Sequence, residues 1–473
     1  MIHNPFKLLF FILIVVIFTS CDWLESETVE YSSNPTFVSL TFTADDSIPA
    51  LSTAYFSLEW DTELNDSVIV NLDSLPYNTA IDSVIPVFTF YSTSAYAVYL
   101  KDSNNVDIDT TYLSGTDTLN FNQVYKIINY AADGVTSRIY PIKVNVHKVE
   151  ANLYQWFKVK NQIFSHPVDR QKAIYFNNTF FYYTISGSKN YLYTSQDAIN
   201  WTEKSNTLSN FPVNANIREL IEFQSKLYFT TSDAKLFSSV DGFNWNNETV
   251  VLSNNDYSFT TLLYSFNSSL FAILKSKVDN SYHFASSSNA IDWFVNDLIP
   301  VNFPISDFAA LSFTTRRKLP KVLVTGGYSA SGNSLKNVWS TENGSYWLDY
   351  STENGTHGYV VGSSIIAYDD SLLLFGGLNT TGSVIESPYL ISRDEGLSWS
   401  VPDTTYNRIR QMYISSSNDT TYTTYEPRAY QSVVYVKSGL DHLIYLIGGV
   451  DPSNSKVYSD VWIGKLNRLS FLQ

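Results

Sequence analysis

The chain has 473 residues, of which 44% are apolar, 16% aromatic and 16% charged, and its formal net charge is −15. This composition is rich enough in apolar residues to bury a large core, and the length favours more than one domain. The negative charge argues against nucleic acid as a partner and against electrostatic binding to anionic lipid.

The N-terminus has the pattern of an export signal. Lys7 precedes an apolar run over residues 8–18, and two small residues separate this run from Cys21. The run is shorter than the roughly 20 apolar residues that a membrane-spanning helix needs. It therefore predicts a signal peptide over residues 1–20.

Cys21 is the only cysteine of the chain. The residues Phe-Thr-Ser-Cys that end there resemble a lipobox, which implies cleavage before Cys21 and a lipid anchor on its thiol. Residues 21–33 would then be a lipidated tether, and the membrane would be a partner through the lipid. The resemblance implies an outer-membrane lipoprotein that faces the cell surface or the periplasm. The alternative is an ordinary signal peptide followed by an incidental cysteine.

Strand-forming residues dominate the rest of the chain and helical periodicity is almost absent, so we expect an all-β fold. Residues 124–130 and 138–146 alternate polar and apolar side chains on either side of Asp133-Gly134, which predicts a hairpin. This hairpin resembles the last one of Ig-like and cadherin-like modules in Bacteroidetes surface proteins. The resemblance implies an Ig-like β-sandwich over residues 34–148 that acts as a spacer.

One motif returns five times from residue 152 onward. Each copy leads from a serine to a tryptophan, and the copies are Ser195–Trp201, Ser239–Trp245, Ser287–Trp293, Ser340–Trp347 and Ser392–Trp399. Successive tryptophans are 44 to 54 residues apart, which is the length of one four-stranded propeller blade. The copies resemble the Asp-box of sialidases. The last two match its spacing, Ser-x-Asp-x-Gly-x-x-Trp, and the first three are one residue shorter.

The Asp-box residues are expected to be structural. An aspartate between two strands accepts hydrogen bonds from backbone N–H groups of the turn, and the tryptophan packs between neighbouring sheets. We assign this structural role, and no catalytic role, to Asp197, Trp201, Asp241, Trp245, Trp293, Trp347, Asp394 and Trp399.

Three apolar strands end in glycine pairs, namely Gly326-Gly327, Gly376-Gly377 and Gly448-Gly449. This pattern resembles the kelch repeat. Together with the Asp-boxes it predicts a six-bladed β-propeller over residues 152–473. The expected blades are near 170–204, 216–250, 258–298, 305–350, 358–402 and 427–470. A strand at 153–159 is expected to pair with the C-terminal strand and close the ring.

The C-terminal stretch Trp-Ile-Gly-Lys-Leu-Asn-Arg-Leu covers residues 462–469. With the lipobox, the Ig-like hairpin and the kelch and Asp-box repeats, it resembles a family of Bacteroidetes lipoproteins of unknown function. The resemblance covers nearly the whole chain. It implies the fold, an Ig-like β-sandwich before a six-bladed propeller, but no activity.

The sequence lacks the motifs that known propeller sialidases and metal sites require. Sialidases carry a Tyr- or Phe-Arg-Ile-Pro motif in the first blade, and residues 172–176 lack it. The histidines of the mature chain are far apart and never at metal-ligand spacing. We therefore expect no metal and no cofactor, and we favour a binding protein over an enzyme.

A ligand is expected where the innermost strands enter the channel, on the face opposite the Asp-boxes. Arginine and aromatic side chains in a concave site suit sugars or peptides. The predicted ligand-binding residues are Arg170, Arg218, His357, Tyr359, Arg428 and Tyr430. The alternative is that the arginines pair with backbone carbonyls between blades.

Three functions remain open from the sequence. The first is a lipid-anchored extracytoplasmic propeller that binds a glycan or a surface protein without catalysis. The second is a glycoside hydrolase or lyase, which requires acidic groups converging at the channel mouth. The third is a structural scaffold subunit of an outer-membrane complex. The sequence leaves the oligomeric state open.

Overall fold

The structure is a computed structural model that describes residues 29–102, 106–148, 150, 153–351, 357–358, 361–402, 408–416, 419–439 and 441–467. The predicted signal peptide, Cys21 and Tyr359 lie outside these residues. The regular elements of the described residues are strands, apart from the short 3-10 helices η1 (Pro49–Thr53), η2 (Ser205–Thr207), η3 (Ile217–Glu219) and η4 (Pro452–Asn454). The all-β prediction is confirmed. Within the described residues no helix has the length and apolar character needed to cross a membrane.

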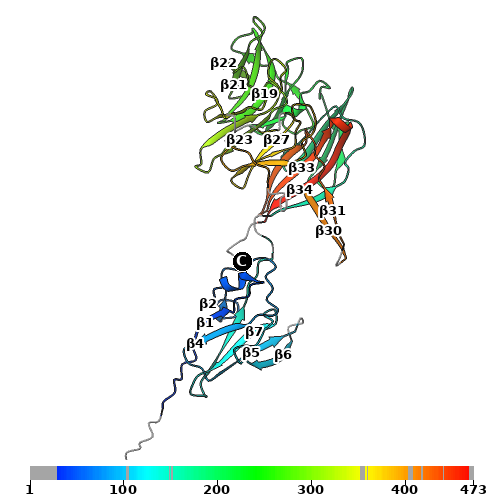
Figure 1. The fold of residues 1–473 in the computed structure, drawn as a ribbon. Coiled ribbons are helices and arrows are strands. Elements are labelled where there is room, and N and C mark those ends of the chain that lie inside the picture. Colours follow the sequence, from blue (N-terminus) through cyan, green and yellow to red (C-terminus); the bar gives the residue numbers. More distant parts are fainter. Residues whose placement is uncertain are drawn as a thin grey trace, which may run out of the picture. The chain divides into compact units, whose positions relative to one another are not determined.

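The chain divides into two compact units, an N-terminal unit within residues 1–151 and a C-terminal unit within residues 152–467. Figure 1 shows them as a ribbon coloured from blue at the N-terminus to red at the C-terminus. The strands of the N-terminal unit are β1 (Phe37–Phe42), β2 (Ser57–Asp61), β3 (Asp66–Val70), β4 (Pro86–Phe90), β5 (Ala95–Lys101), β6 (Asp107–Tyr112), β7 (Val124–Tyr130) and β8 (Ser137–Lys143).

Two sheets share the core of the N-terminal unit. One pairs β1 with β4, and the other has the order β2-β3-β8-β7-β5-β6. Phe42 and Phe88 from the first sheet pack in one apolar cluster with Ile127 and Tyr140 from the second. The predicted hairpin is confirmed, because β7 and β8 pair in antiparallel fashion and Gly134 adopts a positive φ in the turn between them.

Six sheets of mainly antiparallel strands dominate the described part of the C-terminal unit, and most strands of each sheet lie within one predicted repeat. Sheet 1 contains β10 (Arg170–Phe176), β11 (Thr179–Ser186), β12 (Lys189–Ser195) and β13 (Thr202–Glu203). Sheet 2 contains β14 (Ile221–Phe223), β15 (Lys226–Thr230), β16 (Leu236–Ser239) and β17 (Asn246–Asn247). Sheet 3 contains β19 (Tyr257–Phe266), β20 (Ser269–Ser276), β21 (Tyr282–Ser287) and β22 (Asp292–Leu298), with β18 (Val251–Leu252) beside β22.

Sheet 4 contains β23 (Ala309–Thr314), β24 (Pro320–Thr325), β25 (Val338–Thr341) and β26 (Leu348–Asp349), and sheet 5 contains β27 (Ser364–Tyr368), β28 (Ser371–Phe375) and β29 (Tyr389–Ser392). Sheet 6 contains β32 (Ser432–Ser438), β33 (Asp441–Asp451), β34 (Lys456–Leu466) and β9 (Tyr154–Lys160). A separate hairpin of β30 (Arg410–Ser416) and β31 (Asp419–Thr424) comes between sheets 5 and 6 in the chain.

Apolar contacts join each sheet to the next and close a ring. Ring contacts join sheets 1 and 2, 3 and 4, 5 and 6, and 6 and 1, through Tyr183 with Trp245, Tyr264 with Trp347, Phe375 with Trp156, and Tyr445 with Phe180. Common apolar clusters join sheets 2 and 3, with Tyr228 and Trp293, and sheets 4 and 5, with Leu323 and Leu372. The first strand of each sheet also contacts the first strand of its neighbours, or η3 before β14 in the case of sheets 1 and 2. The first strands therefore lie at the centre of the ring.

Strand β9 completes sheet 6, as predicted for the strand near residues 153–159. Trp156 lies opposite Gly464, and Tyr154 lies opposite Leu466 in the antiparallel pairing with β34. A Cβ atom at Gly464 would collide with the ring of Trp156. The glycine therefore leaves the space that the indole needs, and pairing at β34 removes an exposed sheet edge.

Each Asp-box turn follows the third strand of its sheet. Asp197 Oδ1 accepts hydrogen bonds from the N–H groups of Ile199 and Asn200 at 2.9 and 2.8 Å. The hydrogen bond from Asn200 is the main cause that lowers the pKa of Asp197 below its usual range. Asp241 accepts two equivalent hydrogen bonds at 2.8 Å. These carboxylates are therefore engaged in their own turns.

The fourth Asp-box has a different register from the one predicted. Asn343, and not Glu342, accepts hydrogen bonds from the N–H groups of Ser345 and Tyr346 at 2.9 Å. The hydroxyl of Thr341 takes the place of the serine hydroxyl, and it accepts from Gly344 N at 2.9 Å. The fourth copy thus has the short spacing of the first three. The copy at Asp394 keeps the longer one, since its carboxylate accepts from Ser398 N at 2.9 Å.

Candidate functional site

A cavity of about 170 Å³ lies where the first strands of the six sheets begin. Each sheet contributes to its wall, from sheet 1 to sheet 6 through Lys172, Glu219, Leu262, Asp307, Ser363 and Tyr430. Apart from the short β18, neighbouring strands of each sheet run antiparallel, so the start of the first strand lies at the opposite end from the Asp-box turn after the third strand. The cavity is therefore at the channel end away from the Asp-boxes.

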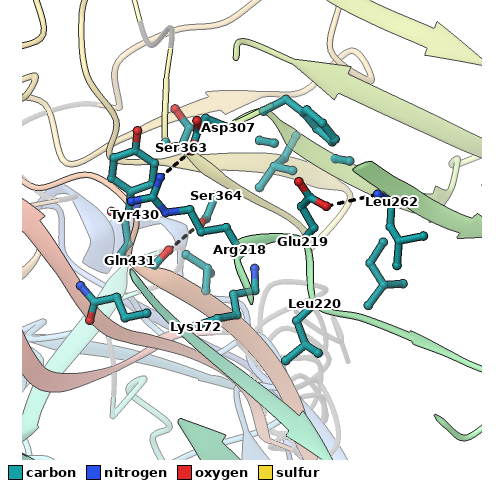
Figure 2. Close-up of a pocket in the computed structure, with 18 of the residues that line it drawn as sticks. Lys172, Arg218, Glu219, Leu220, Leu262, Asp307, Ser363, Ser364, Tyr430 and Gln431 are labelled. Atoms are coloured by element: carbon teal, nitrogen blue, oxygen red, sulfur yellow. Dashed lines mark hydrogen bonds and ion pairs between the residues drawn. The ribbon is translucent and has the colours of Figure 1, made fainter. Parts of the chain in front are cut away.

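An ion pair and an aromatic contact cross the cavity. Arg218 Nη1 donates a hydrogen bond to Asp307 Oδ1 at 2.7 Å, and the guanidinium carbon lies 3.7 Å from the centroid of the Tyr430 ring. Figure 2 shows the Tyr430 ring against Arg218, with a dashed line to Asp307. Burial raises the pKa of the Tyr430 hydroxyl to about 12. The cluster ties together sheets 2, 4 and 6, which are not neighbours in the ring.

The backbone of this cluster is unusual. Asp307 and Tyr430 have φ angles of 54° and 56°, in the left-handed region that side-chain-bearing residues rarely adopt. Gly362 stands between them, since its N–H donates to Asp307 O at 3.0 Å and its carbonyl accepts from Tyr430 N at 2.7 Å. A Cβ atom on Gly362 would lie 2.8 Å from the Tyr430 ring. Three successive sheets therefore enter the channel through one linked set of left-handed residues.

Glu219 follows Arg218 on η3 and presents a carboxyl group to the cavity. Its Oε2 atom accepts hydrogen bonds from Thr230 Oγ1 at 3.0 Å and from Leu262 N at 3.3 Å. Burial raises the pKa of this carboxyl group to about 8, and the nearby charge of Asp307 acts in the same direction. At pH 7 the Glu219 side chain is therefore mostly neutral.

Lys172 is the second cation of the cavity. Its amine points into the space between Arg218 and Glu219 (Figure 2) and has no hydrogen bond or ion pair with another residue that the structure describes. Burial lowers the pKa of the amine to about 8, so the group still carries its proton at pH 7.

Glu219→Gln is expected to stabilise the protein at pH 8 but not at pH 4.5. Because the pKa is raised in the folded state, folded wild type holds more protons than unfolded wild type between about pH 4.5 and 8, and its stability falls as pH rises there. Glutamine resembles the neutral acid and escapes this loss. We expect a gain of about 1–2 kcal/mol at pH 8, after allowance for partial solvent access. Thermal unfolding at both pH values measures it.

The matched control for this prediction is Glu222→Gln, an exposed glutamate on β14. It should leave the melting temperature unchanged at both pH values. An equal effect of Glu219→Gln at pH 4.5 and pH 8 would show that the carboxyl group does not titrate in this window.

The structure brings Arg218 and Tyr430 together but places Arg170, His357 and Arg428 away from the cavity wall. Arg170 donates hydrogen bonds to the carbonyls of Ala215 and Val213 at 2.8 and 2.7 Å, which matches the alternative of pairing between repeats. His357 is buried, contacts Thr325 Oγ1 at 2.7 Å through Nε2, and packs against Trp399. Tyr359 lies outside the described residues.

Arg428 is the clearest correction. Its side chain is 2% exposed, pairs with Asp460, and donates to the carbonyl of Gly448 at 3.2 Å. Its guanidinium lies between the rings of Tyr425 and Tyr458, at 4.0 and 3.7 Å from the centroids. This arginine is part of the core of sheet 6 and does not reach the central cavity.

The sequence analysis missed most of the cavity wall, including the polar residues Lys172, Glu219, Asp307 and Ser363. Lys172 stands two positions after Arg170 and Glu219 directly follows Arg218, so a search that included neighbours of the predicted entry positions would have found these two. Asp307 and Ser363 precede the first strands of sheets 4 and 5. No group of three His, Cys, Asp or Glu side chains suited to a metal ion occurs among the described residues.

Comparisons with known proteins show what the chain is similar to. A search of curated proteins found no match. Similar solved structures include "Structure of YjhT" (12% identity, 65% of this chain, 100% of that chain, TM-score 0.41) and "YCF48 bound to D1 peptide" (9%, 67%, 98%, 0.35). Another is the endo-arabinase from Bacteroides thetaiotaomicron (10%, 60%, 99%, 0.29).

Two family descriptions cover most of the sequence. Residues 31–144 match "Domain of unknown function (DUF6242) N-terminal domain". Residues 150–473 match "DUF6242 beta propeller domain". The chain therefore belongs to the DUF6242 family, and its C-terminal domain is a β-propeller.

Proposed function

We propose that this protein binds a glycan at the end of the channel of its β-propeller, without catalysing a reaction. The observation that carries the proposal is the cavity itself, where six sheets converge and leave Lys172 without a partner among the described residues. Concave sites with a few convergent polar groups are the usual places for ligands. Functional residues carried on the entries to a rigid ring are also typical of binding proteins.

The proposal includes a finer view of the architecture. We infer six blades, because six successive sheets of the described residues are joined in a ring by apolar contacts. We also infer that residues 34–148 form an Ig-like spacer, on the support of two sheets around one core. The glycine pairs and Asp-box turns support a kelch-like and Asp-box-like propeller over residues 152–473.

We further propose that the protein is exported and held on the outer membrane by a lipid on Cys21. The support is the sequence of residues 1–21, with its short apolar run and single cysteine. Such an anchor would place the propeller outside the cytoplasm, where glycans are available. The proposal leaves open whether it faces the cell surface or the periplasm.

One observation favours a second function, glycoside hydrolysis. The carboxyl groups of Glu219 and Asp307 line the same cavity, and Glu219 with its raised pKa would be a general acid at neutral pH. Against this, Asp307 is held in an ion pair with Arg218. A hydrolase needs its second carboxylate free to act as nucleophile or base, so we rank binding first.

The first test is binding of the lipid-free protein, residues 22–473, to a glycan array. We expect a specific glycan to bind to wild type and to bind at least tenfold more weakly to Arg218→Ala, because the variant loses the guanidinium that positions Tyr430 and Asp307. The matched control is Arg393→Ala, an exposed arginine in an Asp-box turn at the other end. It should bind like wild type.

Circular dichroism of each variant establishes that it is folded. A blank array, or unchanged binding by a folded Arg218→Ala, would contradict the proposal. Cleavage of the bound glycan that Glu219→Gln abolishes would establish the hydrolase instead.

A further inference from the structure

The amine of Lys172 has no partner among the described residues, so a negatively charged group would stabilise it. An ammonium group that leaves water without a counter-ion costs several kcal/mol, and proteins normally pair such groups. Lys172 is partly buried at the cavity wall, and within the described residues it has no ion pair. The residues around it are fixed by other contacts, because Asp307 pairs with Arg218 and Glu219 accepts from Thr230 and Leu262.

The charges of the cavity wall do not cancel. The titratable groups that line it are Lys172, Arg218, Glu219, Asp307 and Tyr430. Arg218 and Asp307 offset each other, Tyr430 is neutral at pH 7, and burial raises the pKa of Glu219 to about 8, which leaves its carboxyl group mostly neutral. One positive charge remains, on Lys172, in a chain whose net charge is −15. The local charge is thus opposite to that of the whole protein.

Further hydrogen-bond donors of the same wall, among them Gln171 Nε2, lack a partner among the described residues. Arg218 Nε and Ser363 Oγ are buried and have no hydrogen-bond partner within the described residues. Buried polar groups are normally hydrogen-bonded. Donors that lack a partner among the described residues, close to the Lys172 amine, therefore indicate a ligand that supplies the acceptor atoms. A neutral Glu219 carboxyl group can also donate a hydrogen bond, and the Asp307 carboxylate can accept one from a hydroxyl group.

We propose that the ligand of this site is a sugar that carries a carboxylate, and that this carboxylate pairs with the Lys172 amine. The proposal rests on the proposed function and names its ligand class. A single ammonium matches the single charge of a carboxylate, whereas a more highly charged anion would keep a negative charge without a counter-ion in the cavity. Sugar hydroxyl groups match the remaining wall, which offers Ser363, Ser364 and Glu219.

The test compares acidic sugars with their neutral counterparts on the lipid-free protein. The probes are glucuronate, galacturonate and N-acetylneuraminate, each beside a neutral sugar of the same ring, measured by calorimetry at pH 7 and low salt. We expect at least one acidic sugar to bind at least tenfold more tightly than its neutral counterpart. Lys172→Met should weaken that binding at least tenfold.

Controls separate the roles of charge and fold. Lys172→Met removes a charge that burial disfavours, so its melting temperature should equal or exceed that of wild type. Lys189→Met alters an exposed lysine on β12 of the same sheet and should bind like wild type. The affinity for the acidic sugar should fall above pH 8, where Lys172 loses its proton and Glu219 gains a charge.

Other outcomes overturn the inference in distinguishable ways. If no acidic sugar binds but a neutral glycan binds and is lost in Arg218→Ala, the ligand class is wrong and the proposed function stands. If N-acetylglycine binds as tightly as the acidic sugars, the site recognises any carboxylate and the sugar assignment fails. If no sugar binds at all, both proposals fail.

Discussion

Asp460→Ala is expected to lower the free energy of unfolding of the C-terminal domain by about 3–5 kcal/mol. The carboxylate pairs with Arg428, whose side chain is 2% exposed, and accepts a hydrogen bond from Trp462 Nε1 at 3.0 Å. Lys158 lies 3.4 Å from the same carboxylate. Alanine would leave the buried guanidinium without its counter-ion, and removing one partner of a buried pair costs far more than the pair contributes.

Urea unfolding followed by tryptophan fluorescence measures this effect. The matched control is Asp441→Ala, which removes a surface carboxylate 3.6 Å from Lys465 and should change stability by less than about 1 kcal/mol. Equal effects of the two substitutions would show that Arg428 is not dependent on Asp460. The same experiment on Arg428→Ala separates a core arginine from a ligand-binding one, since it should destabilise the domain rather than weaken binding selectively.

Trp156→Ala should have an effect of similar size, about 3–5 kcal/mol. The indole is 3% exposed, packs against Phe375 with ring centroids 6.1 Å apart, and fills the space that Gly464 leaves open. Its Nε1 atom has no hydrogen-bond partner within the described residues, so the cost is almost entirely lost packing. The substitution would also weaken the contact through which β9 completes sheet 6.

Phe157→Ala is the control for this prediction, because adjacent residues of a strand point to opposite faces and Phe157 is 44% exposed. It should cost less than about 1 kcal/mol. Thermal unfolding of both variants decides the question, and equal melting temperatures would mean that β9 adds little to the ring. If the ring closes less tightly, the proposed glycan binding should also weaken, because Lys172 and Tyr430 line the cavity from sheets 1 and 6.

The sequence by itself determined the turns and the order of the sheets. Asp197 and Asp241 bind backbone groups only two or three residues away, so residue type and spacing were sufficient to predict their turns. The fourth copy shows the limit of this reasoning. Glu342 and Asn343 are adjacent and both can accept hydrogen bonds, and only the backbone conformation decided that Asn343 does so.

Only the tertiary structure decided which charged side chains reach the channel. Arg218 and Arg428 both precede the first strand of a sheet, and nothing in their neighbours separates them. Arg218 meets Asp307, 89 residues away, whereas Arg428 meets Asp460, 32 residues away, inside its own sheet. Strands and turns depend on local and periodic contacts that a sequence displays. The pairing of buried charges depends on which sheets come together when the ring closes, and that was visible only in the folded chain.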